Sequence, residues 1–125
     1  MLALFILSCS LDENQSVSYL PVPIESVSMP ESFVQGQTYQ IDLTYLKPNN
    51  CYSFHDIYFV KEDNTRTVAI INAVLDSGNC QTSGAEIETS FNFIVNDTGS
   101  YIFKFWQGED NQGEDIYLTI EIPVE

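Results

Sequence analysis

The feature that most constrains the fold is a turn followed by a strand near the C-terminal end of the sequence. Residues 96–106 read Asn-Asp-Thr-Gly-Ser-Tyr-Ile-Phe-Lys-Phe-Trp. Tyr101, Phe103 and Phe105 recur at every second position, which is the period of two expected of a strand with one buried face. The opposite face ends at Trp106. A chain with this pattern has to supply a second layer that covers the aromatic row.

The rest of the sequence predicts more strands and turns. The expected strands are 24–29, 39–45, 51–61, 67–75, 87–95, 101–106 and 116–122. Segment 67–75 is short enough to be a helix, but its β-branched residues and turn-rich flanks favour a strand. Near the end of segment 51–61, apolar residues stand at odd and at even positions alike, which predicts a strand that is covered on both faces. The 125 residues therefore predict one all-β domain, an antiparallel sandwich of about seven strands.

The turn before the aromatic row resembles a known structural motif. The spacing Asp97-x-Gly99-x-Tyr101 resembles the tyrosine corner of Ig-like sandwiches, in which the Tyr hydrogen-bonds back across the preceding turn. Phe103 stands where many antibody-type domains carry a Cys. The resemblance therefore implies an Ig-like sandwich without the disulfide that pins the core of those domains.

The N-terminal end predicts a lipid anchor. Met1 to Ser8 are uncharged and almost wholly apolar, and Ile6-Leu7-Ser8-Cys9 resembles the lipobox of bacterial lipoproteins, whose Cys is lipidated. No Lys or Arg precedes the apolar run, as one would in a secretory signal, so it stays open whether Met1 is the true start. The alternative is that this segment is an apolar first strand or a buried terminus. It is too short to span a bilayer, which needs about 20 residues.

These features predict residues 1–8 as a lipoprotein signal segment, 9–23 as the lipidated Cys9 with its tether, and 24–125 as the Ig-like domain. As a whole, 24–125 resembles the small Ig-like lipoproteins of Bacteroidota-type bacteria. The pair Asp12-Glu13 is similar to their export signal to the outer face of the outer membrane. The expected location is therefore the outer membrane, on the cell surface, with the periplasmic side left open.

Charge excludes one class of partner. Four Lys and Arg against eighteen Asp and Glu give a formal net charge of -14, so a nucleic acid would be repelled. An anionic membrane surface would not attract the folded part either, and membrane attachment is expected through the lipid on Cys9 alone.

Two further cysteines predict a disulfide. Cys51 and Cys80 would lie in an oxidising compartment after export, and a bond between them closes a loop of about 30 residues, worth roughly 3–4 kcal/mol on the chain-entropy model. Two free thiols are the alternative.

The sequence predicts neither an enzyme nor a metal or cofactor site. His55 is the only histidine and has no partner at metal-ligand spacing. No serine lies in a nucleophile-elbow pattern. The turn 108–115 carries four carboxylates, but it does not match a calcium loop, and a solvated hairpin tip is the preferred interpretation.

The predicted hairpin register places an aromatic pair on the outer face. Pairing 101–106 with 116–122 about a turn centred between residues 111 and 112 sets Trp106 opposite Tyr117. The pair is either a cross-strand contact or a stacking platform for a sugar ring, which Tyr58 would extend if strand 51–61 neighboured strand 101–106. Two functions follow: a non-catalytic module that binds a glycan or protein, or a structural or accessory subunit of an envelope complex.

Overall fold

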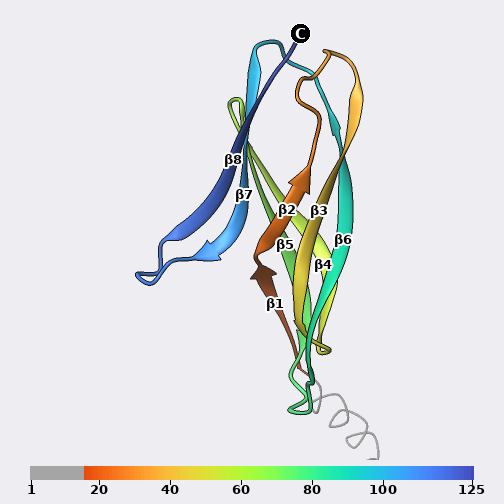
Figure 1. The fold of residues 1–125 in the computed structure, drawn as a ribbon, viewed down its shortest axis with the longest axis vertical. Coiled ribbons are helices and arrows are strands. Elements are labelled where there is room, and N and C mark those ends of the chain that lie inside the picture. Colours follow the sequence, from red (N-terminus) through yellow and green to blue (C-terminus); the bar gives the residue numbers. More distant parts are fainter. Residues whose placement is uncertain (1–15) are drawn as a thin grey trace, which may run out of the picture.

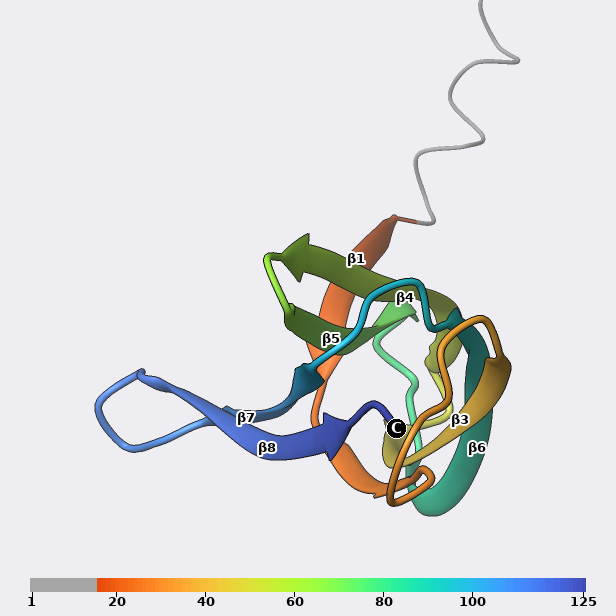
Figure 2. The same ribbon diagram turned by 90° about the horizontal axis from the view of Figure 1, so that it is seen from above.

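The computed structural model describes residues 16–125, which form eight strands (Figure 1). The strands are β1 (Val17–Val22), β2 (Ile24–Ser28), β3 (Thr38–Asn49), β4 (Tyr52–Glu62), β5 (Thr65–Leu75), β6 (Thr82–Ile94), β7 (Ser100–Glu109) and β8 (Asp115–Pro123). Two sheets form: sheet A contains β1, β4, β5, β7 and β8, and sheet B contains β2, β3 and β6. Seen from above, the sheets enclose one core while the β7–β8 hairpin extends away from the body (Figure 2). The predicted all-β sandwich is confirmed, with one strand more than expected.

The additional strand is β1, which corrects the predicted domain boundary. Residues 17–22 were assigned to the tether, but they pair antiparallel with Ile70–Leu75 of β5, and Val22 is buried in the core. The tether prediction failed because a six-residue segment containing Pro21 has weak strand character of its own, and the open edge of β5 supplies the pairing. The folded part therefore includes Val17 and does not begin at Ile24.

Strand β5 occupies the centre of sheet A because it pairs on both edges. One edge pairs with β4 along its length. The other edge is divided: Thr65–Val68 pair with β7 in parallel, and Ile70–Leu75 pair with β1. The parallel pair corrects the prediction of a wholly antiparallel sandwich. It also separates β4 from β7, so strand 51–61 does not neighbour strand 101–106 as the sequence analysis considered.

Strand β4 lies at the edge of sheet A and not under cover. Within residues 16–125 it pairs with β5 alone, and Tyr58, Phe59 and Val60 are exposed. The prediction of a strand covered on both faces is therefore wrong. Its cause is physical: β5, with Val68 and Ile70 fully buried, is the more apolar inward-facing strand and takes the central place.

The predicted register of the β7–β8 hairpin is confirmed. Phe105 pairs with Leu118, Trp106 with Tyr117, and the pairing continues through Phe103↔Ile120, Tyr101↔Ile122 and Lys104↔Thr119. The hydrogen bond expected back across the preceding turn is also present, since the Tyr101 hydroxyl accepts the backbone N–H of Asp97 at 2.9 Å. Alternation fixed this register because a slip by one residue would turn the aromatic row to solvent.

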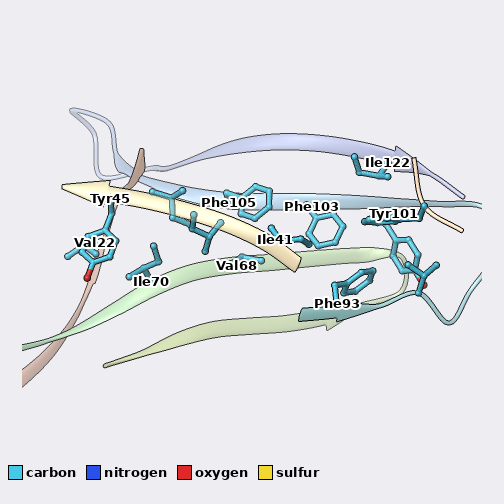
Figure 3. Packing of buried hydrophobic residues seen from close by; sticks show 14 residues of the cluster. Val22, Ile41, Tyr45, Val68, Ile70, Phe93, Tyr101, Phe103, Phe105 and Ile122 are labelled. Carbon is cyan, nitrogen blue, oxygen red and sulfur yellow. The ribbon is translucent and has the colours of Figure 1, made fainter. Parts of the chain in front are cut away.

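The rings of Phe93, Tyr101 and Phe103 gather toward one end of the core (Figure 3). The ring of Phe93 stands edge-on to Tyr101 at 5.0 Å and to Phe103 at 5.1 Å. Arg66, only 4% exposed, lies with its guanidinium 5.0 Å from the centre of the Tyr101 ring and donates to the carbonyls of Asp63 and Thr65. The buried charge is therefore held by an aromatic face and backbone oxygens.

The predicted disulfide between Cys51 and Cys80 is present. It joins the start of β4 to the loop before β6 at the end of the sandwich where the described chain begins (Figure 1). The backbone completes this closure, because Leu75 donates to the Cys51 carbonyl and Asp76 donates to the Ser16 carbonyl, both at 3.0 Å.

Asn72 is a polar side chain in the core whose replacement should stabilise the fold. It is fully buried, and neither its amide nitrogen nor its oxygen makes a hydrogen bond of good geometry among the described residues. Burial raises the pKa of Tyr45, and the contact of the Tyr45 hydroxyl with Asn72 partly offsets that rise. Asn72→Val removes two unpaired groups at nearly constant volume, so the free energy of unfolding should rise by about 1–2 kcal/mol in urea denaturation. Asn72→Ala, which leaves a void, should gain less. A loss of stability in both variants would show that the amide is satisfied, by the Tyr45 hydroxyl or by buried water.

Candidate ligand-binding site

The outer face of sheet A carries a pocket of about 340 Å³. We call it the aromatic pocket; its lining residues are Pro21, Tyr58, Thr67, Ala69, Ile71, Trp106, Glu109, Asp115 and Tyr117. The volume falls at the small end of the range for ligand sites, which is about 300–1,000 Å³. The pocket is therefore large enough for one small ligand or for the head group of a larger one.

The divided edge of β5 creates the pocket. β7 follows β5 as far as Val68, and β1 pairs from Ile70 onward. Between the two partners, Thr67, Ala69 and Ile71 of β5 alternate with residues that face the core and form the floor. The small side chain of Ala69 at this point leaves the space that its larger neighbours would fill.

A bulge in β7 turns the hairpin away from the body. The register of the hairpin shifts between Trp106 and Glu109, and Gly108 has φ +109°, which side chains with a Cβ rarely adopt. A Cβ on Gly108 would lie 3.5 Å from Pro23, and Gln107 Nε2 donates to the Ile24 carbonyl at 3.0 Å. The bulge thus packs against the β1–β2 connection, and Glu109 lines the pocket.

The three aromatic residues proposed from the sequence lie together in this pocket. Tyr58 comes from β4, Trp106 from β7 and Tyr117 from β8. Tyr58 was expected to join the pair only if β4 neighboured β7, and that neighbourhood is wrong. Tyr58 nevertheless lines the pocket from the far side of β5, because it pairs with Ala69. Tyr58 is 51% exposed, so one side of the pocket is an open aromatic wall.

The electrostatic environment of the pocket is negative. Asp115 Oδ1 accepts a hydrogen bond from Trp106 Nε1 at 3.0 Å, and Glu109 adds a second carboxylate. Burial, and then the charge of Asp115, raise the pKa of the Tyr117 phenol above its ordinary value of 10.0. Lys104 Nζ lies 4.4 Å from the centre of the Tyr117 ring, so this ring already holds one cation on its face.

Sequence reasoning missed the floor and the rim of the pocket. Pro21 was assigned to the tether, and nothing in the sequence shows that β1 and β7 share one edge of β5. Glu109 and Asp115 were recognised only as members of an acidic turn. The alternation of Val17, Tyr19 and Pro21 is the one signal that would have placed this segment in a sheet.

Other predicted sites lie elsewhere. Cys9 falls outside the described residues. His55 contacts the Tyr19 ring, with the two ring centres 4.4 Å apart. In the hairpin turn, Asp110 Oδ1 accepts the backbone N–H groups of Gln112 and Glu114, so this carboxylate holds the turn together. Within residues 16–125, no group of three or more His, Cys, Asp or Glu is placed to hold a metal ion.

Comparison with protein-family models, with curated proteins and with solved structures found no match. The part of the chain that the structure describes has no helix long and apolar enough to cross a bilayer.

Asp115→Asn should lower the pKa of Tyr117. The carboxylate opposes formation of the phenolate, and the neutral amide removes that opposition while burial still keeps the pKa above the ordinary value. Tyrosine with ¹³C-labelled ring carbons allows the midpoint to be followed by NMR between about pH 8 and 12, and Tyr117→Phe assigns the signal. Glu114→Gln, a carboxylate outside the pocket, should have the smaller effect. An unchanged midpoint in Asp115→Asn would contradict this electrostatic environment.

Proposed function

We propose that the protein is a non-catalytic, extracytoplasmic lipoprotein module that binds a glycan or protein segment in the aromatic pocket. The observation that carries the proposal is the convergence of Tyr58, Trp106 and Tyr117 from three strands on one cavity with two carboxylates at its rim. Flat aromatic faces beside polar groups bind ligands that are apolar on one side and polar on the other. The strand framework fixes these side chains in place, which lowers the entropic cost of binding.

The Ig-like relationship is part of the proposal. The tyrosine-corner hydrogen bond from Asp97 to Tyr101 supports it, as does the sheet order β2-β3-β6, which corresponds to strands A, B and E of an Ig-like sandwich. The parallel contact between β5 and β7 departs from that arrangement. The fold is therefore proposed as an Ig-like variant in which β5 stands beside the tyrosine-corner strand.

Replacing both Trp106 and Tyr117 by Ala should abolish ligand binding and leave the fold intact. Both residues are only partly buried, so the loss in unfolding free energy should stay near about 1–2 kcal/mol. Binding is measured on a glycan array with the domain 16–125 and the full chain, followed by titration of any hit. Tyr19→Ala, which removes an exposed aromatic side chain of the same sheet, is the matched control and should bind normally. A loss of several kcal/mol with unchanged binding would assign the pair to the core.

Cys9→Ala should release the protein from the membrane. The expectation follows from the lipobox-like residues Ile6 to Cys9 and the polar residues behind them. Membrane and soluble fractions of cells expressing each form are compared by immunoblot, and a fatty-acid label should mark only the chain with Cys9. Membrane association of the variant, or an unlabelled unmodified chain, would contradict the anchor.

The second candidate function is a subunit of an envelope complex, which the exposed edge strand β4 favours. Phe54, Tyr58, Phe59 and Val60 are all exposed there, and an unpaired apolar strand edge can accept another chain. A stoichiometric partner in affinity purification from the membrane, lost when Val60 is replaced by Lys but not in the Trp106 and Tyr117 variant, would favour this alternative.

A further inference from the structure

We propose that the group entering the aromatic pocket is a methylated ammonium ion, a compact cation whose charge is spread over carbon atoms. The inference rests on the proposed binding function and names the chemistry of its ligand. It follows from three properties of the pocket: its ring faces, its charge and its shortage of hydrogen-bond donors.

The ring faces are the first property. Tyr58, Trp106 and Tyr117 all line the same small cavity, and the negative faces of aromatic rings attract cations, Trp most strongly. Lys104 shows the effect within the protein itself, since its ammonium lies 4.4 Å from the centre of the Tyr117 ring. Aromatic side chains of this kind are the residues that recognise quaternary ammonium groups, and three of them line this one cavity.

Charge is the second property. The lining includes the carboxylates of Glu109 and Asp115, and one cation, Lys104, lies beside it on the ring of Tyr117. The whole chain adds a formal net charge of -14, which concentrates cations and repels anions over the Debye length of about 8–10 Å. A cation in the pocket is therefore attracted by the nearby carboxylates and by the net negative charge of the whole chain.

The third property separates a cation from a neutral sugar. Sugar hydroxyls need donors as well as acceptors, but Trp106 Nε1 already donates to Asp115. The Tyr117 hydroxyl also interacts with Asp115. The remaining side-chain donors of the lining are the hydroxyls of Thr67 and Tyr58, and the part of the floor that Ala69 and Ile71 form is apolar. An ion with methyl groups needs no donor, and it contacts apolar and aromatic atoms while the carboxylates at the rim balance its charge.

Choline and its neutral isostere test the inference directly. Trp106 is the only tryptophan, so its fluorescence reports on the pocket without a label. Choline should change this fluorescence with saturation in the micromolar to millimolar range, whereas 3,3-dimethyl-1-butanol, which has the same shape without the charge, should bind at least about tenfold more weakly. Equal affinity for the two compounds would overturn the inference.

Three variants that retain Trp106 locate the cation. Tyr117→Leu removes one ring, and Glu109→Gln removes one charge; each should weaken choline binding, the first by roughly tenfold and the second by a few fold. Lys104→Met removes a competing cation and frees a face of Tyr117, so it should strengthen binding by about two- to fivefold. Thr119→Val, on the same face and outside the lining, is the control. Thermal melting of each variant confirms folding, and unchanged affinity in all three test variants would contradict the site.

A vesicle experiment distinguishes an ammonium group on a lipid from one on a soluble molecule. Vesicles of phosphatidylcholine should compete with free choline and co-sediment with the unlipidated domain if the group is presented on a lipid. Competition by free choline without co-sedimentation assigns it to a soluble molecule. Absence of any response to choline up to about 100 mM, combined with glycan binding that requires Trp106, would refute the inference and leave the proposed function standing. If neither choline nor any glycan or protein binds through Trp106, both fail.

Discussion

The hydrogen-bonding edge of β5 is the constraint on which the rest of the structure depends. That edge accepts β7 in parallel along Thr65–Val68 and β1 in the opposite direction along Ile70–Leu75. Because backbone N–H and C=O groups of a buried strand must be paired, two separate segments have to meet end to end along one edge. On the outer face β7 and β1 do not continue into one another. The aromatic pocket lies between these two strands, above Ala69. The pairing of β5 with both β7 and β1 thus accounts for the buried inner face of the sheet and for the cavity on its outer face.

The sequence predicts the local features of this fold much better than its long-range ones. The pairing of Trp106 with Tyr117 is predictable because the hairpin is closed by a short turn and its buried row is aromatic, so a slip by one residue carries a large penalty. The disulfide was predicted from two cysteines in a domain that the sequence leads one to expect outside the cytoplasm. By contrast, no periodicity reports which strand lies beside β5. The parallel contact with β7 joins segments more than 30 residues apart, and it depends on which apolar strands bury most area together.

The candidate site shows the same division. The aromatic side chains were found because alternation assigns Trp106 and Tyr117 to the outer face, and Tyr58 was found as a possible extension. The floor and the N-terminal wall were missed, since Ala69 and Pro21 have no chemical signature and acquire a role only when β1 completes the sheet. An exposed aromatic pair on a flat sheet would be a cross-strand contact and nothing more. The Trp106–Tyr117 pair is a candidate binding site because β1, β4 and the bulge at Gly108 enclose the space beside it.

The pairing of β1 also determines how the domain responds to mechanical load. The chain enters the sandwich at Val17 and runs along β5 for six residue pairs before it crosses to sheet B. Antiparallel hydrogen bonds lie perpendicular to their strands, so a force pulling on the N-terminal end acts along β1 and loads these bonds together in shear. Bonds loaded in shear must break at the same time, unlike bonds at a fraying end that open one after another. The first strand is therefore expected to resist such a pull, and the Cys51–Cys80 disulfide closes the end of the molecule at which the pull would act.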